Sequence, residues 1–320
     1  MRNSLLIGVA VLIAAAFLPL VMSDYLVHIG VLVLMYAYLA TAWNILGGYA
    51  GQHSLGHALF MGIGAYTSTY LFTRWGITPW LGLWPGALLA GLAGWLVGDI
   101  CFRFGLKGSY FALVTIALAE AGVYLVTSSD ALGGNEGLAV TWMGQRPDLM
   151  QFEDKRMYYY IILTMTAFAI LLTAWLAQRR FGYQMLAVRE NEDAAEALGI
   201  DTFGIKVRAT IISAVLTALG GVFFAQYFTY VNPRAVFGEG VSVQILLFAI
   251  IGGLGTVWGP ALGALVLAPL AELSRALFSN VFSGANLLIY GIVLVVVMLF
   301  FPRGLMGLLE RLSIRKTVKQ

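Results

Sequence analysis

Two histidines and a serine lie together in a glycine-rich stretch of the sequence. His53 and His57 are four residues apart, so they share one face if the stretch is helical. Such a pair could begin a metal site, but a zinc centre needs a third and a fourth ligand. The chain has only one further histidine, His28, and one cysteine, Cys101. We therefore expect neither a metal nor a cofactor.

Ser54 beside His53 raises the alternative of an intramembrane hydrolase. Adjacent residues on a helix point to different faces, and no G-x-S-x-G turn surrounds Ser54. We therefore expect no catalytic residue. Polar groups in hydrocarbon are costly unless they are paired, so we interpret these side chains as the lining of a pathway or as helix-to-helix hydrogen bonds. The candidate pathway residues are Asn44, Gln52, Ser54, His57 and Glu120.

Glu120 joins this set because it lies inside a long apolar run, LVTIALAEAGVYL. Carboxylates at membrane depth are costly and typical of functional sites. Glu120 could line a pathway, relay protons or pair with a buried partner, although a relay usually needs several such groups. Glu272 and Arg275 are three residues apart in another apolar run and are expected to pair with each other.

The composition identifies the setting in which these residues must work. Of 320 residues, 60% are hydrophobic and 11% are charged, with a mean hydropathy of +0.85; soluble domains carry about 25% charged residues. The chain is therefore expected to be an all-α, polytopic membrane protein. A net charge of +3 without a basic stripe argues against nucleic acid as a partner. Cys101, as the only cysteine, excludes an internal disulfide.

Apolar runs of about 20 residues are long enough to cross a bilayer as helices. We predict about ten spans in a single transmembrane domain over residues 1–320. The first run lacks an A-x-A cleavage site, so we take it as a span and not as a signal peptide. The runs lie near 5–22, 26–46, 55–73, 80–98, 108–126, 157–177, 207–230, 241–254, 261–278 and 285–301.

The basic residues predict the orientation, because cytoplasmic loops are rich in Lys and Arg. With the N-terminus inside, thirteen of the 19 Lys and Arg residues fall on the cytoplasmic side. Both termini, the tail 303–320 and the loop 178–206 are then cytoplasmic. The loop 127–156 is external, and its length suits either a docking element or a solvated loop.

Two glycine-rich stretches interrupt the apolar runs, one at 47–66 and one at 252–265. Non-helical backbone at membrane depth is tolerated where protein or a wet cavity satisfies it, so paired interruptions indicate a transport pathway. The alternative is that glycines only allow close helix packing. The candidate gating glycines are Gly47, Gly48, Gly51, Gly252, Gly253 and Gly255.

The segment 178–206, QRRFGYQMLAVRENEDAAEALGIDTFGIK, is strongly polar and is predicted to form an amphipathic helix. A helix of this kind could lie on lipid headgroups. Its five acidic residues oppose contact with an anionic membrane surface, which favours a protein partner in the cytoplasm. No glycine precedes a lysine anywhere in the sequence, so a phosphate-binding G-x-x-x-x-G-K-[ST] loop is absent. If the protein pumps, its ATPase is another chain.

Six motifs together resemble the LivM-type permease subunits of bacterial branched-chain amino acid ABC transporters, over nearly the whole chain. They are NILGGYAGQHSLGHALFMGIGAY (44–66), LKGSYFALVTIALAE (106–120), LGGNEGL (132–138), GYQMLAVRENEDAAEALGI (182–200), IIGGLGTVWGPALGA (250–264) and FPRGL (301–305). His53 departs from the small or aliphatic residue expected there, which puts a pathway role for its side chain in doubt.

The resemblance implies an importer of the bacterial inner membrane that works by alternating access. Its partners would be a second, homologous permease subunit, two cytoplasmic ATP-hydrolysing subunits and a periplasmic substrate-binding protein. This chain would not be an enzyme itself. The segment 182–200 resembles the coupling helix that such permeases insert into the ATPase. Its implied coupling residues are Arg189, Glu190, Glu192, Ala194, Ala195, Leu198 and Gly199.

Three alternatives stay open at this point. Related permeases carry urea, short amides or other amino acids, and no residue of this chain selects among these substrates and the branched-chain amino acids. A secondary transporter that needs no motor has the same gross architecture. An intramembrane enzyme using His53, Ser54 and His57 is the least favoured.

Overall fold

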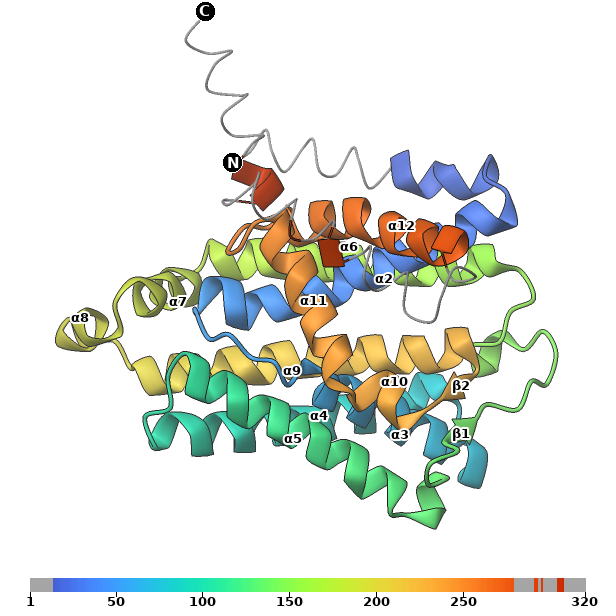
Figure 1. The fold of residues 1–320 in the computed structure, drawn as a ribbon, viewed down its shortest axis with the longest axis horizontal. Coiled ribbons are helices and arrows are strands. Elements are labelled where there is room, and N and C mark those ends of the chain that lie inside the picture. Colours follow the sequence, from blue (N-terminus) through green and yellow to red (C-terminus); the bar gives the residue numbers. More distant parts are fainter. Residues whose placement is uncertain (1–13, 279–290, 293–294, 296–303, 308–320) are drawn as a thin grey trace, which may run out of the picture. The chain divides into compact units, whose positions relative to one another are not determined.

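The computed structural model describes residues 14–278, 291–292, 295 and 304–307. Half of the predicted span near 5–22, most of the span near 285–301 and most of the tail 303–320 lie outside these residues. A helix occupies each of the eight predicted runs between them. The helices are α2 (Asp24–Asn44), α3 (His57–Trp75), α4 (Pro79–Arg103), α5 (Ser109–Thr127), α6 (Lys155–Ala177), α7 (Arg180–Glu190), α8 (Glu192–Ala197), α9 (Thr202–Phe228), α10 (Pro233–Phe237), α11 (Glu239–Gly252) and α12 (Gly259–Phe278) (Figure 1).

Seven helical segments among the described residues are long and apolar enough to cross a membrane. They comprise α2 with the π-helical turn that continues it (Ile45–Tyr49), α4, α5, α6, α9, α10 together with α11, and α12. The described chain is thus a polytopic bundle of helices, as predicted. Helix α3 has the length of a span but is less apolar, and the total of ten spans stays a prediction.

The described chain divides into two compact units. One comprises residues 42–154 and 171–246, and the other is formed by the segments 1–41, 155–170 and 247–320. Helices α2, α6 and α11 each continue from one unit into the other. We refer to them as the larger and the smaller unit.

The larger unit is built around α9, which packs along α3 and α4 (Figure 1). Glycines make this close approach feasible. A Cβ at Gly64 of α3 would overlap with the carbonyl oxygen of Ala218, and one at Gly94 of α4 would lie 2.7 Å from the Cβ of Ala214. Helices in lipid associate through such small residues because apolar burial alone does not drive them together.

The loop 127–156 is folded against the ends of membrane helices. Its strand β1 (Leu138–Ala139) pairs in antiparallel fashion with β2 (Tyr230–Val231), which follows α9. The buried Gln151 side chain donates to the carbonyl of Thr141 at 2.8 Å and accepts from the Met143 amide at 2.9 Å. Trp80, at the start of α4, donates to the Pro147 carbonyl at 2.9 Å. The loop is therefore tied by hydrogen bonds to the start of α4 and to the strand after α9.

The smaller unit joins the first part of α2 to α6, and the end of α11 to α12. Thr166 of α6 donates to the Leu34 carbonyl at 3.0 Å, and the Tyr159 ring lies against Gly30. Gly263 of α12 meets the backbone of Phe248 so closely that a Cβ would overlap with it. The Glu272–Arg275 pair, expected from the spacing, forms at 2.7 Å.

We predict that Gly64→Ala destabilises the protein by about 2–3 kcal/mol, because the new methyl group forces α3 away from α9. The apparent Tm of the purified protein in detergent measures the change. Gly240→Ala is the matched control, since no atom of the described residues lies within 4 Å of a Cβ at Gly240. Equal Tm values for the two variants would contradict close α3–α9 packing.

Candidate functional site

The polar segment 178–206 forms two helices, α7 and α8, and not the single helix predicted. The break is Asn191, whose backbone is extended with φ −160° and ψ 109°. Its side-chain oxygen accepts from the Ala194 amide at 3.0 Å and so caps α8, a role that Asn often takes. Glu192 and Asp193 lie in the first turn of α8, where acidic residues are favourable. Gly199, with φ +80°, ends α8 in a left-handed conformation.

Arg189, at the end of α7, binds the break in the first glycine-rich stretch. Its Nη1 donates to the carbonyl of Gly48 at 2.8 Å. Its side chain also lies against Gly51, where a Cβ would be 3.0 Å from the Arg189 Cγ. Gly51 has φ +71°, a conformation that favours glycine. The predicted coupling residue Arg189 therefore contacts two predicted gating glycines of its own chain.

Glu192, the first residue of α8, forms an internal ion pair with Lys206 of α9. Lys206 is only 4% exposed, and its ammonium lies 4.8 Å from the centre of the Phe102 ring of α4. The second carboxylate oxygen of Glu192 is 3.4 Å from Lys107, in the loop between α4 and α5. Glu192 raises the pKa of the Lys107 ammonium. Glu192 thus holds α8 to α9 and to the loop between α4 and α5.

A different set of side chains faces outward from α7 and α8. We call Glu190, Asp193, Ala194 and Leu198 the α8 surface. The side chains of Glu190 and Asp193 are 76% and 90% exposed, and Leu198 is 82% exposed. Ala195 is buried within the chain, so it does not belong to this surface although the sequence grouped it with Ala194. Arg189 and Glu192 bind within the chain, although the Arg189 side chain is 35% exposed.

The first glycine-rich stretch turns from helix into non-helical chain before α3. After the π-helical turn, residues 50–56 are non-helical, and α3 begins only at His57. His53 and His57 therefore do not share a helix face, contrary to the expectation from their spacing. Trp43 supports the non-helical segment: its Nε1 donates to the carbonyl of Ser54 at 2.7 Å, and its ring covers Gly47.

The predicted pathway residues around this break are buried and bound within the chain. Ser54 accepts from the Gly56 amide at 3.2 Å, and Gln52 donates to the carbonyl of Ala50 at 3.2 Å. Asn44 is fully buried. These two hydrogen bonds are local and join no second helix, so the pathway role of this set stays a prediction.

His57 links α3 to α9. Its Nε2 lies 2.7 Å from the Ser213 hydroxyl, which itself donates to the carbonyl of Ala42 at 2.7 Å. Since Ser213 has a single hydroxyl hydrogen, the His57 Nε2–H must be the donor to it. The Nδ1 is then an acceptor, and no described atom pairs with it.

The described part of the chain contains no group of three or more His, Cys, Asp or Glu side chains that could hold a metal ion. His53 is exposed. The rings of His53 and His57 both lie near Trp43, with ring centroids 6.3 and 6.2 Å from that of the indole.

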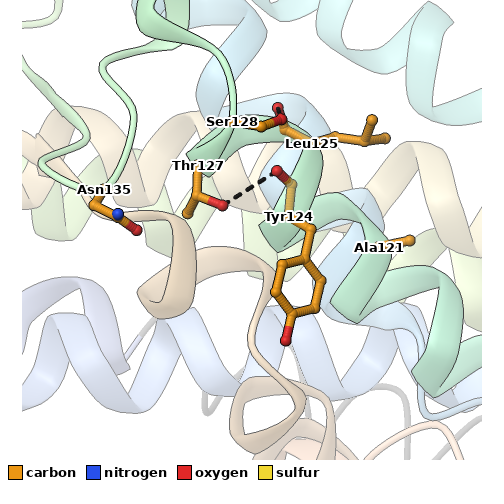
Figure 2. A pocket seen from close by; sticks show the side chains of 6 residues that line it. All are labelled: Ala121, Tyr124, Leu125, Thr127, Ser128 and Asn135. Atoms are coloured by element: carbon orange, nitrogen blue, oxygen red, sulfur yellow. Dashed lines mark hydrogen bonds between the residues drawn. The ribbon is translucent and has the colours of Figure 1, made fainter.

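Glu120 lies apart from these residues, on α5. It is half-buried, and its carboxylate accepts from the Glu239 amide at the start of α11, at 3.4 Å. A helix N-terminus is a favourable partner for a carboxylate. Next to it, the end of α5 borders a shallow hollow of about 550 Å³ (Figure 2). The hollow is open and is lined by Ala121, Tyr124, Leu125, Thr127, Ser128 and Asn135.

The second glycine-rich stretch is a true interruption between α11 and α12. Residues 253–258 are non-helical, and Gly253 and Gly255 have φ values of +129° and +68°. Thr256 pairs with backbone groups that the interruption leaves without helical partners. Its hydroxyl donates to the Gly253 carbonyl at 2.8 Å and accepts from the Gly259 amide at 3.0 Å. Both predicted interruptions are thus present, each within its own unit.

Comparison with known proteins adds the family context. A family model described as the permease component of branched-chain amino acid transport systems matches residues 25–301. The high-affinity branched-chain amino acid transport permease protein LivM of Escherichia coli is 28% identical, over 93% of this chain and 74% of its own length. The LivH permease of Salmonella typhimurium is 23% identical over 85% of this chain and 91% of its own. No solved structure matches.

We predict that Glu192→Gln lowers the free energy of unfolding by about 3 kcal/mol, because it leaves the buried Lys206 ammonium without its counter-charge. Adding Lys206→Met should recover more than half of this loss, since the uncompensated charge is then gone.

The apparent Tm in detergent measures both variants of the Glu192–Lys206 pair. Glu190→Gln is the control: this carboxylate is 76% exposed, so its removal should change stability by less than about 0.5 kcal/mol. If Glu192→Gln behaves like Glu190→Gln, the ion pair does not hold α8.

Proposed function

Because the chain belongs to the family of branched-chain amino acid transport permease components, we propose that it is the permease subunit of an ATP-driven importer. In this role it provides a membrane pathway and makes or breaks no covalent bond. The observation that carries the coupling role is the α8 surface, which lies between two candidate membrane spans, α6 and α9. The internal anchors at Arg189 and Glu192 hold the segment, and the α8 surface is left exposed.

The partner of the α8 surface is a cytoplasmic ATPase subunit. The surface combines two carboxylates, Glu190 and Asp193, with the small Ala194 and the protruding Leu198. This composition fits a socket with basic and apolar side chains, and it is unsuited to anionic lipid headgroups. The chain has no phosphate-binding loop of the Walker type, so ATP is bound and hydrolysed by the partner. Gly199 sets the turn that follows α8 and takes no direct part in the contact.

The complete importer contains a second, homologous permease, two ATPase subunits and a periplasmic protein that delivers substrate. Both LivM and LivH permeases resemble this chain, which supports pairing with a related permease. Such an assembly works in the inner membrane, with both termini and the loop 178–206 on the cytoplasmic side. The ordered loop 127–156 then faces the binding protein.

The pathway changes access at the two glycine-rich interruptions. The six candidate gating glycines lie within or close to the non-helical backbone of these two interruptions. A small rotation of φ and ψ there reorients the helix that follows. Asn44, Gln52, Ser54 and His57 bring polar groups to the first interruption, and Glu120 lies near the start of α11. Alternating access requires that substrate and nucleotide favour different arrangements of these segments.

Branched-chain amino acids are the proposed substrates, since the relatives named above are permeases of systems for them. We predict that the complete complex in vesicles takes up labelled leucine, isoleucine or valine only with ATP on the ATPase side. Labelled urea serves as the comparison solute. Uptake of urea alone would revise the substrate, and uptake by this chain alone under an ion gradient would identify a secondary transporter.

A variant of the α8 surface tests the coupling contact. We predict that Leu198→Arg weakens ATPase binding by about tenfold or more, equivalent to 1.4 kcal/mol, because it places a charge where Leu198 enters an apolar socket. Co-purification of ATPase subunits with the tagged chain measures this.

Met143→Arg is the matched control for Leu198→Arg, since it puts the same charge on an exposed apolar position, 56% exposed, of the loop 127–156. Retention of the ATPase by Leu198→Arg at the level of this control would remove the α8 surface from the interface.

A further inference from the structure

Arg189 occupies a hydrogen-bonding position that the break in α2 leaves open. In a continuing α-helix the Gly48 carbonyl would accept from the amide of residue 52. Here the Gln52 amide donates instead to Leu46, at 3.1 Å, because the π-helical turn shifts the pairing. The Arg189 Nη1 takes the vacated place at 2.8 Å. A residue of α7 thus completes the backbone hydrogen bonding of the π-helical turn that continues α2.

The contact extends beyond one hydrogen bond. Gly51 presses its backbone against the Arg189 side chain, with a hypothetical Cβ 3.0 Å from Cγ and 3.2 Å from Cα. Any larger residue at Gly51 would have to displace Arg189 and would also be strained by φ +71°. The end of α7 therefore cannot shift without disturbing the Gly48–Gly51 segment.

The location of Arg189 in α7 gives this contact its significance. It is the second-last residue of α7, two positions before the extended Asn191 and three before Glu192, which is bound to Lys206 of α9. A displacement of α8 reaches the rest of the larger unit through its contacts with it. The contact at Glu192 leads to Lys206 of α9 and to Lys107, and the contact at Arg189 leads to the first glycine-rich interruption.

We propose that Arg189 transmits movement of α7 and α8 to the break at Gly48–Gly51, and so links the ATPase contact to the gate. Arg189 is a positioning residue: it touches neither nucleotide nor substrate. The inference rests on the proposed coupling to an ATPase and goes further, because it names the route by which that coupling reaches the membrane pathway.

The test measures accessibility of the break in the assembled importer. Cys101, the only cysteine, is buried in α4, and Cys101→Ser gives a background free of thiols. His53→Cys then places a thiol at an exposed position two residues after Gly51. The rate of maleimide labelling is compared without nucleotide and with a non-hydrolysable ATP analogue. If the conformation of the Gly48–Gly51 segment depends on nucleotide binding to the ATPase subunits, the two labelling rates should differ by about fivefold or more.

Two variants interrupt the contact from opposite sides, Arg189→Gln and Gly51→Ala. Each should bring the ratio of the two rates close to one, while the ATPase stays bound and still hydrolyses ATP. Arg180→Gln is the matched control, because Arg180 is an exposed arginine at the other end of α7; it should keep the full ratio. A purely structural role for Arg189 would reduce assembly and hydrolysis instead of the ratio alone.

The possible outcomes distinguish the proposed role of Arg189 from the proposed function of the chain as an ATPase-coupled permease. If Arg189→Gln keeps the full ratio, Arg189 does not transmit the movement. If the unsubstituted break shows no nucleotide dependence while the ATPase is bound, the inference fails and the permease function stands. If no ATPase accompanies the chain at all, both fail. Should Arg189→Gln not assemble, Gly51→Ala decides the question from the other side of the contact.

Discussion

The structure depends on one constraint: in hydrocarbon, a break in a helix is stable only if other groups of the protein pair with the backbone it frees. Each interruption in the described chain meets this need with a side chain from elsewhere or from its own turn. The Arg189 guanidinium donates to the Gly48 carbonyl. The Thr115 hydroxyl accepts from the Leu55 amide, and the Ser242 hydroxyl accepts from the Ala58 amide at 2.8 Å. In the second stretch Thr256 provides both a donor and an acceptor.

These partners also make the conformation of each interruption depend on neighbouring segments. A regular helix is held by its own hydrogen bonds, so its conformation is independent of its neighbours. The Gly48–Ala58 segment is held instead by α5, α7 and α11, through Thr115, Arg189 and Ser242. Its conformation is therefore coupled to the positions of three helices, whereas the close glycine contacts of α3 and α4 with α9 keep that part of the larger unit rigid.

The sequence predicted the helices well because the hydrophobicity that indicates a span can be read from a short stretch of sequence alone. Eight apolar runs each contain a helix, but their ends depend on pairs that a hydropathy scan does not see. Helix α4 continues to Arg103, past the predicted end near 98, where Asp99 and Arg103 pair at 2.8 Å. Helix α9 starts at Thr202 instead of near 207, because Asp201 caps it and Glu192 neutralises the buried Lys206. That last partner is fourteen residues away, on another helix.

The roles of the charged residues in 178–206 were the hardest to predict, and the break at Asn191 is the reason. In one continuous helix, Arg189, Glu192 and Glu196 would follow a single face, since their spacing is three and four residues. The extended backbone of Asn191 restarts the helix in a new direction. Arg189 then points to Gly48 and Glu192 to Lys206, while the Asp193 side chain is 90% exposed, with Lys107 3.5 Å away. The segment thereby has a charged inner side, matched by its own chain, and an exposed outer side whose carboxylates, Glu190 and Asp193, lie 3.8 Å from Arg189 and 3.5 Å from Lys107.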